Sequence, residues 1–158
     1  MHPAISRFAS QTYYENVIKD GVLIDERRMC DKFRGIWPRG AAQPLRFVDC
    51  RQPEQSLQGL GGRRDADRRS KGDRLVASCL ERHPHSIANL QEARRIAEDA
   101  ARLLRDGLAP SSLFVVTPYK AQEMLLWKLL GEELTEEELG GIKIGSVHSG
   151  QGTTSSTL

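Results

Sequence analysis

The chain lacks most of the features that mark secreted, membrane or metal-binding proteins. Its three cysteines, Cys30, Cys50 and Cys79, fit neither a disulfide framework nor a zinc site. No apolar run approaches the roughly 20 residues that a membrane-spanning helix needs, and the first residues lack the apolar core of a signal peptide. These absences predict an intracellular protein, cytoplasmic or nuclear, in a reducing compartment and with no membrane partner.

The chain also has a small net charge and few aromatic side chains. The net charge is +2, from 23 basic and 21 acidic residues, and aromatic residues make up 6% of the chain. So small a charge does not by itself indicate nucleic-acid binding. With 158 residues the chain has room for one domain with a real core.

The last third of the chain carries the clearest pattern. Residues 113–116 are a short β-branched and aromatic run, residues 142–147 are again strand-like, and residues 121–130 between them place apolar side chains at helical spacing. Strand, helix and strand in this order predict a parallel βαβ unit. Its two polar tips, 117–119 and 148–154, are then expected at the same edge of the sheet, where ligands bind in such folds.

Other segments give simpler predictions. Residues 89–106 form the best helical pattern, with Asn89 as its cap and Glu92 at the third position, as in a capping box. Residues 3–17 predict an amphipathic packing helix, and residues 45–50 predict a strand.

Two stretches predict loops. Residues 51–74 are glycine-rich and basic with few apolar side chains, so we expect a disordered insertion; a basic arm that touches nucleic-acid phosphates is the alternative. Gly131 is expected to end the preceding helix, and the acidic stretch 131–141 to form a solvated loop. His83 and His85 predict a surface turn rather than a metal site, because no further ligand lies at suitable spacing.

Three short motifs give the chain a family resemblance. The run Thr117-Pro-Tyr-Lys-Ala-Gln122 resembles the T-P-Y-x-x-Q motif of superfamily 1 helicases, in the branch of the nonsense-mediated-decay RNA helicase. The run Ser146-Val-His-Ser-Gly-Gln-Gly152 resembles that branch's (S/T)-V-D-S-F-Q-G motif, and Met1-His2-Pro3 resembles the end of its Q-Y-R-M-H-P motif. The motifs follow the family's order.

The resemblance implies a fold and a set of partners. The whole chain, 1–158, would be the C-terminal RecA-like domain of a P-loop NTPase helicase: an incomplete α/β, three-layer domain with a parallel sheet. An intact relative would use ATP and Mg²⁺, bind single-stranded RNA or DNA, and carry an N-terminal RecA-like domain that this chain lacks. No G-x-x-x-x-G-K-(S/T) loop and no Asp-Glu pair for magnesium occur in this sequence. The chain alone is therefore expected to need no cofactor and to hydrolyse no ATP.

The resemblance also implies roles for single residues. Gln151 and Gly152 would lie near the terminal phosphate of the nucleotide, where glycine lets the backbone approach a ligand closely. Tyr119 has an aromatic ring that could stack on a base or could equally pack under the following helix, and Gln122 is expected to link the two tips by hydrogen bonds. The residues implied on the nucleic-acid path are Thr117, Pro118, Tyr119, Gln122, Ser146, His148 and Ser149.

The sequence also departs from the family pattern. His148 stands where the family has aspartate, Gly150 replaces a bulky aromatic residue, and Thr154 stands where an acidic residue is usual. The first motif is cut at its start and the family's last arginine motif is missing, so a fragment of a helicase is expected. Two alternatives stay open: a degenerate, non-catalytic RecA-like interaction module, and a small α/β enzyme with a site near His148.

Overall fold

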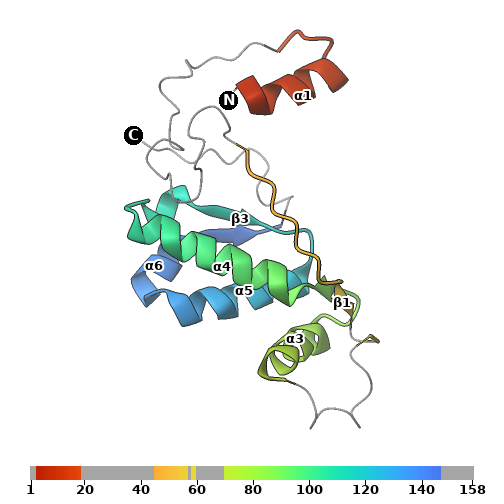
Figure 1. Ribbon diagram of the computed structural model, residues 1–158, viewed down its shortest axis with the longest axis vertical. Helices are drawn as coiled ribbons and strands as arrows, with labels where there is room; N and C mark the ends of the chain where they lie inside the picture. Colours follow the sequence, from red (N-terminus) through yellow and green to blue (C-terminus); the bar gives the residue numbers. More distant parts are fainter. Residues whose placement is uncertain (1–2, 19–44, 57, 60–69, 147–158) are drawn as a thin grey trace. The chain divides into compact units, whose positions relative to one another are not determined.

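The computed structural model describes residues 3–18, 45–56, 58–59 and 70–146 and divides the chain into two units, Met1–Asp49 and Cys50–Leu158 (Figure 1). In the first unit, helix α1 spans Pro3–Tyr13, so it is shorter than the predicted helix. It ends because Glu15 and Asn16 adopt positive φ angles of 48° and 64°. The ring of Phe8 meets that of Tyr13 edge-on, with centroids 6.4 Å apart.

The strand predicted at residues 45–50 is wrong. These residues form no regular structure, and Phe47 is 93% exposed. A β-prone sequence forms a strand only where a neighbouring strand satisfies its backbone groups and packs against its side chains.

Three helices form the core of the second unit. They are α3 (Lys71–Arg82), α4 (Leu90–Arg105) and α5 (Lys120–Glu133). Helix α5 packs against both α3 and α4, and α4 and α5 lie side by side (Figure 1). Small residues on α4 allow this close approach and leucines on α5 fill the interface; the buried residues of the two helices include Ala93, Ala97, Ala100, Ala101, Leu125, Leu126, Leu129 and Leu130.

The predicted βαβ unit is confirmed. Strand β3 (Phe114–Val116) pairs in parallel with β4 (Lys143–Gly145), and α5 lies between them in the chain. The register aligns Val116 with Gly145, so both strands end at one edge of the sheet. The first predicted tip, 117–119, follows β3 at this edge, and the second, 148–154, lies outside the described residues.

The segment 51–74 was expected to be disordered, and that expectation is wrong at both ends. Strand β1 (Gln55–Ser56) pairs antiparallel with β2 (Ile87–Ala88). Helix α3 starts at Lys71 because the hydroxyl of Ser70 caps it, accepting the Asp73 N–H at 3.1 Å. Pairing with a distant strand orders the first end and a helix cap orders the second, despite their polar composition; residues 57 and 60–69 lie outside the described part of the chain.

The acidic stretch 131–141 was expected to be a loop, and this is also wrong. Helix α5 continues through Gly131 to Glu133, and α6 (Glu136–Gly141) follows directly. Thr135 and Glu138 form a full capping box at the start of α6: the Thr135 hydroxyl accepts the Glu138 N–H, and the Glu138 carboxylate accepts the Thr135 N–H at 2.9 Å. The Thr135 hydroxyl also donates to the same carboxylate oxygen at 2.9 Å. The bond from the Thr135 N–H, and after it the bond from the hydroxyl, lower the pKa of the Glu138 carboxyl.

A close contact fixes where β3 and β4 begin. The 3₁₀ helix η4 (Pro110–Ser112) leads into β3, and Gly141 leads into β4. A Cβ atom added to Gly141 would lie 2.6 Å from Cβ of Pro110, well inside contact distance. Only glycine lets the two strand entrances approach this closely.

We therefore expect Gly141→Ala to destabilise the fold by about 1–2 kcal/mol, because overpacked sites must shift their neighbours. Gly140→Ala is the matched control, since a Cβ at Gly140 meets no atom within 4 Å. It should be neutral or slightly stabilising, because alanine favours a helix over glycine. Urea denaturation followed by circular dichroism compares the two variants; equal midpoints would contradict the contact.

In the part of the chain that the structure describes, no helix combines the length and the apolar character needed to cross a bilayer.

Candidate nucleic-acid interface

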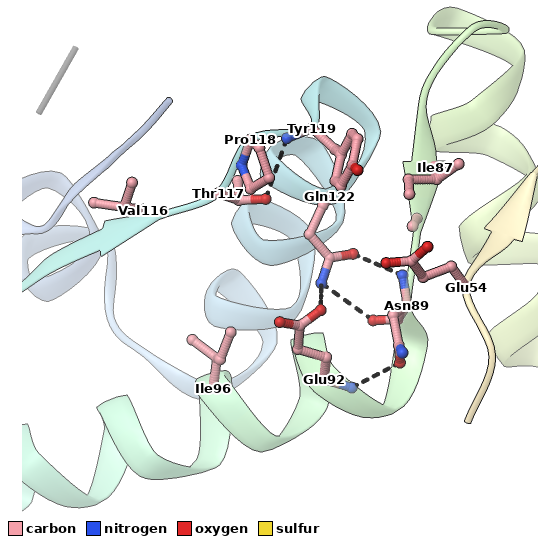
Figure 2. A pocket seen from close by; sticks show the side chains of 11 residues that line it. Glu54, Ile87, Asn89, Glu92, Ile96, Val116, Thr117, Pro118, Tyr119 and Gln122 are labelled. Atoms are coloured by element: carbon pink, nitrogen blue, oxygen red, sulfur yellow. Dashed lines mark hydrogen bonds between the residues drawn. The ribbon is translucent and has the colours of Figure 1, made fainter. Parts of the chain in front are cut away.

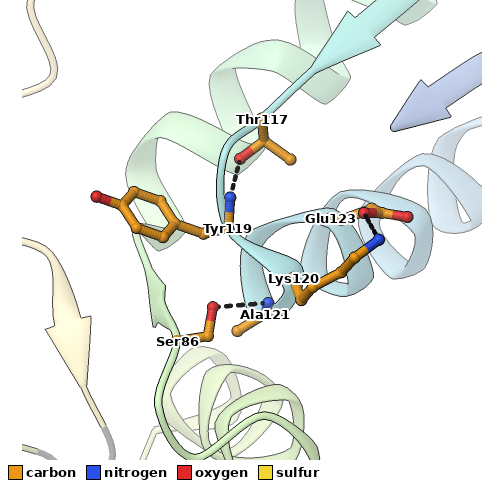
Figure 3. Close-up of polar contacts among 6 residues, drawn as sticks. All are labelled: Ser86, Thr117, Tyr119, Lys120, Ala121 and Glu123. Atoms are coloured by element: carbon orange, nitrogen blue, oxygen red, sulfur yellow. Dashed lines mark hydrogen bonds and ion pairs between the residues drawn. The ribbon is translucent and has the colours of Figure 1, made fainter. Parts of the chain in front are cut away.

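The tip after β3 is built by a turn at Thr117. Its N–H continues the strand pairing and donates to the carbonyl oxygen of Gly145 at 3.0 Å. Its buried hydroxyl accepts the N–H of Tyr119 at 3.4 Å, which turns the chain out of the strand (Figure 3). Pro118 and Tyr119 are therefore presented at the surface, and the Tyr119 residue is 42% exposed.

The start of α5 is held by a residue from another element. Tyr119 is the N-cap of α5, but its side chain accepts no hydrogen bond from the helix. Instead Ser86, in the turn between α3 and β2, accepts the Ala121 N–H through its hydroxyl oxygen at 3.1 Å (Figure 3). The Lys120 ammonium lies 2.8 Å from a Glu123 carboxylate oxygen, so its charge is partly neutralised. The positive end of the α5 dipole nevertheless lies directly beside the tip.

Gln122 is buried beneath the tip, with 4% of its surface exposed. Its Oε1 accepts the N–H of Asn89 at 2.9 Å, and its Nε2 donates to the Asn89 carbonyl and to Oε2 of Glu92, both at 3.2 Å (Figure 2). The sequence interpretation had Gln122 linking the two tips. In the structure its amide bonds to the start of α4, because the first turn of α5 packs there; the second tip, 148–154, lies outside the described residues.

The same contacts revise the expected start of α4. Asn89 caps the helix as predicted, and its Oδ1 accepts the Glu92 N–H at 3.0 Å. The reciprocal bond of a capping box is not made by Glu92, because Gln122 occupies that position from α5. Nδ2 of Asn89 donates to the carbonyl of Gln52 at 2.8 Å, which attaches the segment before β1.

These elements enclose a pocket of about 190 Å³ at the end of β3 (Figure 2). The tip contributes one wall, the β1 and β2 segments a second, and the first turns of α4 a third. The lining residues are Glu54, Ile87, Ala88, Asn89, Glu92, Ile96, Val116, Thr117, Pro118, Tyr119 and Gln122.

The structure brings part of the predicted site together. Thr117, Pro118, Tyr119 and Gln122 line one pocket, and the half-buried Ser146 follows β4 at the adjacent strand end. The other predicted residues, His148, Ser149, Gln151 and Gly152, lie outside the described residues.

Sequence reasoning missed the second half of the pocket. Glu54 lies in a segment that was expected to be disordered, and Asn89 and Glu92 were interpreted as a helix start rather than as site residues. Asn89 meets Gln122 across 33 positions in the chain, and no local pattern signals such a contact.

Neither a metal site nor a reactive Cys79 thiol has support in the described residues. No group of three or more His, Cys, Asp or Glu side chains that could hold a metal is found among them. His83 and His85 lie in the turn that was predicted, closed by a hydrogen bond from the Ser86 N–H to the His83 carbonyl at 2.9 Å. Burial raises the pKa of the Cys79 thiol, although the charge of Lys128 opposes this, so the thiol is poorly suited as a nucleophile.

Comparison with known proteins places this geometry in a family. The whole chain, residues 1–158, matches the AAA domain family. The chain belongs to this AAA family. A helix-rich α/β fold with a small parallel sheet agrees with that assignment.

Curated relatives agree with the resemblance drawn from the three motifs, which is thereby confirmed. The chain is 27% identical to the Regulator of nonsense transcripts 1 homolog of Arabidopsis thaliana, over 96% of this chain and 10% of that protein. It is 24% identical to the ATP-dependent helicase NAM7 of Saccharomyces cerevisiae, over 96% of this chain and 13% of that protein. It is 28% identical to the DNA polymerase alpha-associated DNA helicase A of Schizosaccharomyces pombe, over 90% of this chain and 19% of that protein.

The chain thus spans between a tenth and a fifth of the length of these relatives.

Proposed function

We propose that this chain is the C-terminal RecA-like domain of an ATP-dependent RNA or DNA helicase. It contributes one wall of the ATP cleft and part of the path of a single strand. In the intact protein, the N-terminal RecA-like domain would form the opposite wall of the cleft, and ATP and Mg²⁺ would bind between the two domains. The observation that carries the proposal is the parallel pairing of β3 and β4, which starts both motif tips at one edge of the sheet.

The two tips would contact two ligands, the single strand and the nucleotide. The single strand passes over Thr117, Pro118 and Tyr119 and over the second tip at Ser146, His148 and Ser149. Gln151 and Gly152 contact the terminal phosphate of the nucleotide. Because the Thr117 N–H bonds to Gly145 at the end of β4, a displacement of either tip is transmitted to the other across one hydrogen bond.

Within this proposal Gln122 is a positioning residue. Its amide is committed to Asn89 and Glu92, so it holds the tip against α4 rather than offering a free group to the strand. The binding contacts then fall to the exposed tip residues and to the positive end of α5, which favours an anionic ligand.

The test replaces the exposed aromatic ring of the tip. We expect Tyr119→Ala to weaken binding of a labelled single-stranded oligonucleotide about tenfold, because stacking of one base on an aromatic side chain contributes roughly 1–3 kcal/mol. Fluorescence anisotropy on the 158-residue chain, at one fixed salt concentration, measures the change.

Tyr119→Phe is the matched control. It keeps the ring and removes only the hydroxyl, so binding should stay within about twofold of the original chain, since the stacking surface is retained. If the chain bound no single strand at all, the non-catalytic interaction module would replace the helicase proposal.

A further inference from the structure

The pocket beside the β3 tip is acidic. Glu54 reaches it from the segment before β1 and Glu92 from the first turn of α4, and no Lys, Arg or His side chain is among its described lining residues (Figure 2). A phosphate group inside would meet two like charges at short range, which is unfavourable. The phosphate backbone of a strand is therefore excluded from the pocket, and a neutral group with hydrogen-bond donors is favoured.

The size and walls of the pocket suit one aromatic ring. In another protein an apolar cavity of about 150 Å³ binds benzene, and this pocket measures about 190 Å³. Ile87, Ile96 and Val116 supply apolar surface, and the partly exposed ring of Tyr119 supplies a stacking partner. A nucleobase offers both the flat face and the polar edge that such a site needs.

One carboxylate in the pocket is held ready to accept a hydrogen bond. Nε2 of Gln122 donates to Oε2 of Glu92 at 3.2 Å, which fixes the orientation of the group. In the part of the chain that the structure describes, the other oxygen of Glu92, Oε1, accepts no hydrogen bond. Glutamate accepts readily from an exocyclic amino group, as it does from N4 of cytosine in duplex readout.

We propose that this pocket takes one unstacked base of the bound strand and selects bases that carry an exocyclic amino group, cytosine or adenine, over uracil or thymine. The ring stacks on Tyr119 and the amino group donates to Glu92. Uracil and thymine present a carbonyl oxygen at the same ring position, which the carboxylate repels. The proposal rests on the function proposed above, because the strand must pass the tip to deliver the base.

The experiment compares two oligonucleotides that differ in this group. Labelled single strands of cytidine and of uridine, equal in length, are titrated with the 158-residue chain at one salt concentration. We expect the cytidine strand to bind about tenfold more tightly, within the usual range for one good base-edge contact.

The variant Glu92→Gln gives the sharper result. Its carbonyl oxygen can accept from Gln122 in place of the carboxylate, which leaves the NH₂ group to face the base. This NH₂ group can donate a hydrogen bond to the carbonyl oxygen of uracil, but it cannot accept one from the amino group of cytosine. The preference for cytidine should therefore disappear or reverse, with the uridine strand binding more tightly than to the original chain.

Glu98→Gln is the control, because Glu98 is exposed on α4 and does not line the pocket. It should keep the preference for cytidine, and thermal melting verifies that both variants fold. Equal affinity of the original chain for the two strands, or an unchanged preference in Glu92→Gln, would overturn the base pocket and leave strand binding intact. Binding of neither strand would overturn the proposed function together with the pocket.

Discussion

Gln122→Leu is expected to lower the free energy of unfolding of the second unit by about 2–3 kcal/mol. Leucine has a similar size, so the effect comes from hydrogen bonding rather than from a cavity. The Asn89 N–H is left buried without its acceptor, and an unsatisfied buried group costs about 1–3 kcal/mol. The Asn89 carbonyl keeps its bond from the Ala93 N–H, so the carbonyl is not left without a partner.

The matched control is Gln91→Leu, one position before Glu92. Gln91 is exposed and its Oε1 accepts the Gln52 N–H at 3.0 Å at the surface, where water can replace it. We expect a loss of less than about 1 kcal/mol there. Urea denaturation of both variants, followed by far-ultraviolet circular dichroism, gives the comparison. Equal losses would mean that Gln122 does not act through its buried bonds.

Leu126→Ala is expected to have the largest effect on stability of the substitutions considered. Leu126 is fully buried on α5, the helix that packs against both α3 and α4. Truncation of a buried leucine to alanine costs about 2–5 kcal/mol through lost burial and the cavity left behind. Thermal melting of the variant should show a lower midpoint, and the transition should remain cooperative if α5 is the centre of the core.

Leu134→Ala provides the comparison at the end of the same helix. Leu134 is only half-buried and serves as the C-cap of α5, so its loss should cost less than half as much. If the two variants had the same melting temperature, α5 would not be the element on which the core depends.

Periodic patterns predicted the part of the fold that surrounds the tip. Strands β3 and β4 and helices α4 and α5 all follow from apolar residues at the spacing of each structure, and the parallel pairing follows from their order. These elements form locally and bury one apolar face, so single-sequence reasoning is sufficient for them.

The missed elements fall into two kinds. Helices α3 and α6 carried signals that were overlooked, since Ser70 with Asp73 and Thr135 with Glu138 mark helix starts in a polar context. Strands β1 and β2 have only two residues each, too few for a period of two to be recognised. Pairing between distant segments, rather than local preference, forms them.

The candidate site was predictable only on its β3 side. The motif from Thr117 to Gln122 gave four lining residues, but Glu54 and Glu92 enter the pocket through packing of α4 and of the segment before β1. The bonds that Gln122 makes to the start of α4 were also not foreseen, since Asn89 is distant in the chain. A motif names residues that matter without stating whether they touch a ligand or hold the fold.

The cap that Ser86 provides for α5 has a consequence for motion. Ser86 precedes β2, Asn89 precedes α4, and both bind the first turn of α5 through Ala121 and Gln122. Hydrogen bonds with Ser86, which follows α3, and with Asn89, which caps α4, thus fix the base of the tip. The tip therefore cannot move independently of these helices, as a hinged lid would. If the function proposed above holds and two RecA-like domains open and close around ATP, we expect this tip to move together with α3 and α4 as one rigid body, so that the rotation of the whole domain would set the step along the strand.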